Sequence, residues 1–147
     1  MLCNTKPLKQ WKPVSFNIKN PSSFSDCSGF PNTQYVVFTN DGTYRIFNVE
    51  AKAHVLCHGD LGDDMTVLSA TARATIEVSN DNADWTLLKE SNTVTADRVK
   101  NATASVSTFY SWDNGCPYKY IRCGTHGSAF KRYVEASLTG LKRGKLE

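Results

Sequence analysis

Residues 110–118 hold the densest set of side chains in this sequence that could bind a ligand. Three aromatic and two polar side chains fall within nine residues: Tyr110, Trp112, Asp113, Asn114 and Tyr118. Ligand sites combine apolar or aromatic surface with a few polar groups that fix orientation, and a sugar needs both. The segment predicts a loop that binds carbohydrate. The alternative is a strand end and turn whose aromatic rings pack inward.

The motifs of common enzyme classes do not occur in the sequence. It contains no Gly-x-Ser-x-Gly, no P-loop and no dinucleotide-binding glycine motif. Cys27 and the histidines could form a Cys–His pair, but most chains of this size contain such a set. The acids of residues 60–64 are typical of a solvated turn. We therefore expect no enzymatic activity.

The spacing of His54 and His58, with Cys57 between them, is the nearest approach to a zinc motif. In an extended strand the two histidines would lie roughly 13 Å apart. We therefore predict no metal site and no cofactor.

The cysteine count indicates reduced thiols. Five cysteines cannot all pair within one chain, and residues 1–7 lack the apolar stretch of a signal peptide. We expect free thiols and synthesis in the cytoplasm. The sequence leaves open whether Cys116 and Cys123 meet on neighbouring strand ends.

Length and charge restrict the class of protein. The chain has 147 residues, of which 40% are hydrophobic and 21% charged, as in one globular domain. No apolar run of about 18 residues exists, so we expect no membrane span. The net charge of +3 arises from basic ends around an acidic middle. Bases mix with aromatic rings only near residues 9–12 and 118–122, so we do not expect nucleic-acid binding.

Alternation with a period of two predicts an all-β fold. In residues 70–79, an apolar residue stands at every second position, and residues 45–55, 102–112 and 133–139 alternate in the same way. In residues 45–55 the predicted inward face begins at Phe47. Asn40-Asp41-Gly42 predicts a hairpin turn. We predict an antiparallel β-sandwich of about seven or eight strands without a helix.

The prolines divide the chain. Residues 1–31 contain four of the five, so we predict an N-terminal arm over 1–31, a sandwich over 32–141 and a tail over 142–147. Trp11, Phe16 and Ile18 are spaced to lie against an apolar surface. That surface belongs either to the same chain or to a neighbouring subunit.

The second half of the chain contains several short motifs, formed by Ser79, Asp81, Trp85, Tyr120, Ile121, Arg122, Glu135 and Gly140. These motifs resemble those of the discoidin-like family, also called the coagulation-factor C-type or galactose-binding-like jelly rolls. The resemblance covers about residues 70–140. Asn82 and Lys119 stand where the family usually has Gly and Arg. The resemblance implies a jelly roll with ligand loops at one end. In some relatives the residue matching Glu135 binds a structural calcium, but this sequence supplies no complete oxygen set.

Two functional hypotheses follow. The first is a non-enzymatic module that binds a glycan or another surface ligand, as a component of a virion or phage tail. The second is a structural assembly subunit of a virion or similar complex, without a small ligand. In the second, residues 1–31 reach a protein partner or another copy of the chain and pair there as a strand.

Overall fold

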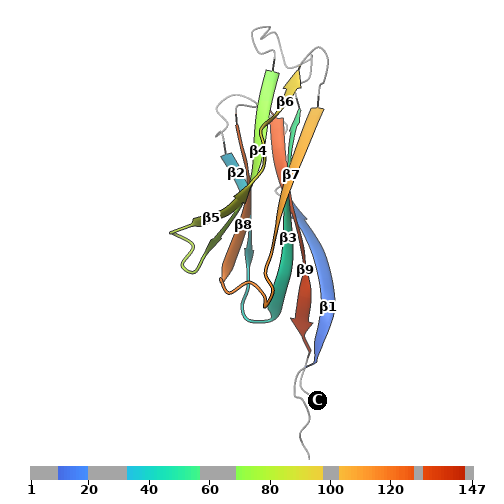
Figure 1. Cartoon of the computed structure of the whole chain (residues 1–147), viewed down its shortest axis with the longest axis vertical. Helices are drawn as coiled ribbons and strands as arrows, with labels where there is room; N and C mark the ends of the chain where they lie inside the picture. The colour runs from blue at the N-terminus through green and yellow to red at the C-terminus, as the bar shows by residue number, and fades with distance from the viewer. Residues whose placement is uncertain (1–9, 20–32, 57–68, 98–102, 128–130, 145–147) are drawn as a thin grey trace, which may run out of the picture.

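The computed structural model describes residues 10–19, 33–56, 69–97, 103–127 and 131–144, and these residues form strands, turns and no helix (Figure 1). None of the described residues forms an apolar helix that could cross a membrane. The nine strands are β1 (Trp11–Lys19), β2 (Thr33–Thr39), β3 (Tyr44–Leu56), β4 (Ser69–Ser79), β5 (Thr86–Glu90), β6 (Val94–Asp97), β7 (Thr103–Ser111), β8 (Tyr120–His126) and β9 (Lys131–Arg143).

The strands form two antiparallel sheets that pack face to face (Figure 1). The four-stranded sheet has the order β1-β9-β3-β7. The five-stranded sheet has the order β2-β8-β4-β5, and β6 pairs with the other half of β4. The predicted antiparallel β-sandwich is confirmed.

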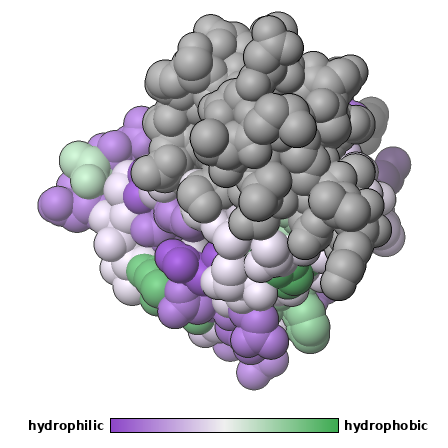
Figure 2. Space-filling model, turned by 90° about the horizontal axis from the view of Figure 1, so that it is seen from above, coloured by the Kyte–Doolittle hydropathy of each residue, from purple (hydrophilic) through white to green (hydrophobic). Residues whose placement is uncertain are grey.

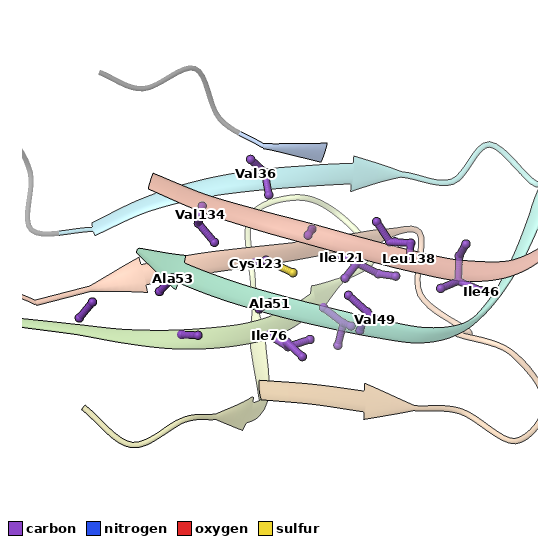
Figure 3. Close-up of a cluster of buried hydrophobic side chains, with 14 of the residues drawn as sticks. Val36, Ile46, Val49, Ala51, Ala53, Ile76, Ile121, Cys123, Val134 and Leu138 are labelled. Carbon is purple, nitrogen blue, oxygen red and sulfur yellow. The ribbon is translucent and has the colours of Figure 1, made fainter. Parts of the chain in front are cut away.

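The core lies between the sheets and follows the predicted alternation. Figure 3 shows side chains from both sheets pointing into the shared layer. Alanines occupy the middle of β3 and β4, where Ala51, Ala53, Ala72 and Ala74 are fully buried. Small side chains there let the two sheets approach closely, while larger residues such as Ile76 and Leu138 fill the rest of the layer.

The predicted inward orientation of Phe47 is wrong. The pairing of β3 with β9 shifts between Ile46 and Asn48, so Phe47 is the extra residue of a β-bulge. A bulge reverses the phase of the alternation, because each residue beyond it points to the opposite face. Ile46, 1% exposed, therefore takes the core position, while Phe47 is only partly buried.

The boundary predicted between the arm and the sandwich is also wrong. Residues Trp11–Lys19 are an edge strand of the sandwich, paired with β9 over nine positions. Pro13 is tolerated because an edge strand needs only one row of hydrogen bonds. Phe16 and Ile18 pack against the core, and the ring of Trp11 lies beneath Arg45. Residues 1–9 and 20–31 of the predicted arm lie outside the described residues.

The C-terminal boundary needs a smaller correction. Strand β9 continues to Arg143, two residues beyond the predicted end of the sandwich. The backbone N–H of Arg143 donates to the carbonyl of Thr43, and that of Gly144 donates to the carbonyl of Gln10. The first part of the predicted tail is therefore held by the sheet.

Candidate functional site

The segment 110–118 lies against one end of the sandwich. Tyr110, Trp112 and Tyr118 are partly buried and pack on the core. Tyr110 and Trp112 meet edge to face, with ring centroids 5.1 Å apart. Asp113 and Asn114 are exposed in the turn that follows. The three rings thus pack against the core, as the inward-packing alternative predicts, while the two polar residues face solvent.

Two cysteines lie among the described residues, and both are free thiols in the structure. Burial raises the pKa of the Cys123 thiol to about 12. Burial also raises the pKa of Cys116, whose Sγ lies 3.7 Å from the carbonyl oxygen of Tyr118. Neither thiol is poised to act as a thiolate at neutral pH. Cys27, Cys57 and His58, weighed above for a Cys–His pair or zinc, lie outside the described residues.

Among the residues that carry the discoidin-like resemblance, Ser79 and Asp81 form a turn and Arg122 forms an ion pair with Glu77. The Asp81 carboxylate accepts hydrogen bonds from the backbone N–H groups of Asp84 and Ala83 and from the Ser79 hydroxyl. These three bonds lower the pKa of Asp81 to about 2. Asn82 has a positive φ of 61°, so an asparagine fills the position where the family usually has glycine.

Arg122 forms the centre of a cluster on the outer face of the five-stranded sheet. Its guanidinium lies 3.9 Å from the ring centroid of Tyr35 and 4.2 Å from that of Trp85. Nε and Nη2 donate to the two carboxylate oxygens of Glu77, at 2.9 and 3.2 Å. Both charged side chains are mostly buried, with exposures of 20% and 15%. The ion pair and the two ring contacts make this cluster a stabilising element of the sheet.

The outer face of the four-stranded sheet is lined by short polar side chains, and we call it the polar face. Asn17 donates to the hydroxyl of Ser137, at 2.9 Å. Asn48 donates to the hydroxyl of Thr139 at 3.1 Å and accepts from that of Ser111 at 2.7 Å. These residues point outward because their neighbours in each strand fill the core. A row of amides and hydroxyls therefore crosses β1, β9, β3 and β7.

Phe109 is the exception on the polar face. It follows Ser107 and precedes Ser111 on the outward side of β7, opposite Glu50 of β3. Its side chain is 66% exposed, the highest value among the large hydrophobic residues described. In the coloured part of the view from above, hydrophobic residues appear as small separate patches among more hydrophilic ones (Figure 2). Phe109 is therefore a single exposed ring beside the hydroxyls of Ser107 and Ser111.

His54 lies on the same face, between two side chains that sequence analysis did not connect to it. Its Nδ1 is 2.7 Å from Ser105 Oγ, and its Nε2 is 2.6 Å from Glu135 Oε2. The ring of Tyr133 stacks on the imidazole, with a centroid distance of 4.3 Å and an interplanar angle of 18°. Burial and the Glu135 carboxylate raise the pKa of Tyr133, so its phenol stays protonated at neutral pH.

A shallow depression of about 240 Å³ lies beside this group. Its lining residues are Lys52, His54, Ser105, Val106 and Ser107. Among the described residues, no three His, Cys, Asp or Glu side chains lie close enough together to hold a metal ion. The polar face thus combines a depression, an exposed ring and many hydrogen-bonding groups.

The fold places the chain among the two-sheet antiparallel β-sandwich proteins. No protein-family model matches the sequence, and no curated protein matches it.

Several solved structures are similar at low identity. One is dimeric latent PorU from Porphyromonas gingivalis (12% identity, TM-score 0.41), covering 90% of this chain and 13% of that one. Another is Eiger TNF from S. frugiperda (10% identity, TM-score 0.40), where the match covers 93% of this chain and 95% of that one. A third is the Cowpea Mosaic Virus empty virus-like particle (9% identity, TM-score 0.41), where the match covers 100% of this chain and 88% of that one. At these values the likenesses carry no functional inference, and the discoidin-like resemblance stays a prediction.

Proposed function

We propose that this chain is a carbohydrate-binding module whose ligand lies along the polar face. The observation that carries the proposal is the exposure of Phe109 among hydroxyl, amide and charged groups. The apolar face of a sugar ring covers an aromatic ring, while its hydroxyls exchange hydrogen bonds with surrounding polar groups. This proposal moves the predicted carbohydrate site from residues 110–118 to the outer face of the four-stranded sheet.

The spacing of the polar face supports an extended ligand. Neighbouring strands lie about 4.8 Å apart, and outward residues along a strand about 6.6 Å apart. Asn48, Ser111 and Ser137 therefore offer donors and acceptors at regular intervals beside Phe109. Such a surface suits a chain of sugars better than one small molecule, because the depression beside His54 is shallow.

The test is glycan binding by wild type and by Phe109→Ala, first on a glycan array and then by calorimetry with the best ligand. Leu87→Ala is the matched control, because Leu87 is also exposed (48%) but lies on the five-stranded sheet. We expect Phe109→Ala to weaken binding by at least tenfold and Leu87→Ala to leave it unchanged. Equal affinity in all three proteins, or no glycan bound by wild type, would refute the proposal.

The assembly subunit is the second candidate, and one observation favours it. Val37 and Leu87, 44% and 48% exposed, flank the Arg122–Glu77 pair on the outer face of the five-stranded sheet. Trp, Tyr and Arg are enriched at protein interfaces, and the cluster contains all three residue types. The candidate partner is a second copy of this chain. Light scattering should then give the mass of an oligomer, and Leu87→Asp should give that of a monomer.

A further inference from the structure

Ser105, His54 and Glu135 form a continuous series of hydrogen bonds across three adjacent strands. The hydroxyl, the imidazole and the carboxylate are joined by contacts of 2.7 and 2.6 Å. A nucleophile bonded to a base, which is in turn held by a third group, is the arrangement that activates serine in acyl transfer. No sequence motif indicates this arrangement, because Ser105 and Glu135 lie 51 and 81 residues from His54 in the chain.

We propose that Ser105 is an activated nucleophile and that the chain hydrolyses carboxylic esters of short acyl groups. The proposal goes beyond carbohydrate binding and rests on residues other than Phe109. It also departs from the expectation of a chain without catalysis. The depression of about 240 Å³ lined by Ser105 and His54 is large enough for a short acyl group but too shallow for a long one.

The ring is held in one orientation by three neighbours. When Nε2 carries the proton, it donates to Glu135 and leaves Nδ1 free to accept the proton of Ser105. Tyr133 stacks on the imidazole and keeps it from turning. The side chains of His54 and Glu135 are only 16% and 22% exposed, which strengthens their hydrogen bond. Glu135 is therefore a positioning residue for the base.

The reaction can be written with every proton accounted for. Ser105 Oγ bonds to the ester carbonyl carbon as its proton moves to His54 Nδ1, and the carbonyl π electrons move to oxygen. Lys52, which lines the depression, is placed to balance that negative charge. The carbon–alkoxy bond then breaks, and the leaving oxygen takes the proton from His54. Water attacks the acyl carbon as His54 takes its proton, the bond between that carbon and Ser105 Oγ then breaks, Oγ takes the proton from His54, and the carboxylic acid leaves.

The first test is covalent labelling with a fluorophosphonate probe. Ser105 Oγ bonds to phosphorus, fluoride leaves, and the hydroxyl proton passes through His54 to solvent. Ser15→Ala is the control, because Ser15 is an exposed serine of β1 that does not line the depression. Intact-mass analysis should show one label on wild type and Ser15→Ala, and none on Ser105→Ala or His54→Ala. Labelling that persists in Ser105→Ala would overturn the proposal.

The second test is hydrolysis of p-nitrophenyl acetate. We expect Ser105→Ala and His54→Ala to lose at least 100-fold in kcat/KM, the usual contribution of a general base. Glu135→Gln should lower kcat about tenfold with KM unchanged, because the carboxylate acts only through the base. Circular dichroism and melting temperature show whether each variant is folded. Folded variants that all retain wild-type kcat/KM would refute the mechanism, and this outcome would leave the glycan proposal standing.

Discussion

Replacing Arg122 by alanine should destabilise the sandwich far more than replacing an exposed arginine. Arg122 makes two charge-assisted hydrogen bonds to Glu77, and its guanidinium lies between the rings of Tyr35 and Trp85. A mostly buried ion pair of this kind contributes about 2 kcal/mol, and the two cation–π contacts add about 1 kcal/mol together. We therefore expect Arg122→Ala to lower the free energy of unfolding by about 3 kcal/mol.

The measurement is thermal and urea unfolding followed by far-ultraviolet circular dichroism. For a chain of this length, 1 kcal/mol changes the melting temperature by about 3 °C, so Arg122→Ala should melt about 9 °C below wild type. Arg122→Lys should lose about 2 kcal/mol, because lysine keeps the charge but not the planar fork that stacks between the rings. The decrease should appear in the urea midpoint with an unchanged m-value.

Arg73 is the matched control on the same sheet. Its Nε lies 2.9 Å from Glu90 Oε1 without the alignment of a hydrogen bond, and the two side chains are 39% and 49% exposed. Exposed pairs contribute less than about 1 kcal/mol, so Arg73→Ala should melt within about 3 °C of wild type. If Arg122→Ala loses no more stability than Arg73→Ala, the cluster is not a stabilising element and the reasoning fails.

Three further predictions concern one residue each. Gly140→Ala should cost about 3 kcal/mol in urea unfolding, because a Cβ at this position would lie 2.1 Å from the carbonyl oxygen of Arg45; wild-type stability would contradict that clash. The pKa of Asp81 is lowered from 3.8 to about 2, so its contribution to stability is complete above pH 4 and is lost as the pH falls towards 2. Over that interval Asp81→Asn should lose less stability than wild type, and identical acid unfolding curves would contradict this. Cys123, 1% exposed, should react with a maleimide only as the chain unfolds, and labelling of folded protein, mapped by mass spectrometry, would show that β8 opens locally.

The core faces could be predicted from sequence because alternation depends only on neighbouring residues. Ala72, Ala74, Ile76 and Val78 are fully buried as the pattern requires. The prediction fails at Phe47, where a bulge inserts one residue into β3. Nothing in a single sequence marks that position, because the bulge is defined by the pairing with β9.

Strand β1 was missed for a different reason. Its proline and lysines are typical of an arm, yet Pro13 and Lys12 are also residues that protect an edge strand from further pairing. An arm and an edge strand therefore have the same composition. An edge strand differs only in having a partner strand, here more than 100 residues away, and the local sequence pattern does not indicate such a distant contact.

The contacts of His54 with Ser105, Tyr133 and Glu135 could not be predicted for the same reason, because they join strands that are distant in the sequence. The outward orientation of His54 follows from buried Ala53 and Val55, but its neighbours depend on strand order and register. A slip of β7 by two residues would keep its core face and still place a hydroxyl, Thr103 or Ser107, opposite His54.

A slip of β9 by two residues would also keep the core face, but it would place Glu135 or Lys131 opposite His54 in place of Tyr133. This register therefore has to be fixed by something other than burial. Gly140 supplies that restraint. It pairs with Ile46 beside the bulge, at a place where the carbonyl of Arg45 leaves no room for a Cβ. A two-residue slip would bring Leu138 or Lys142 to this position, and both carry a Cβ. The glycine that allows the close approach of β3 and β9 thereby also keeps Tyr133 opposite His54 and Glu135 one pair further along β9.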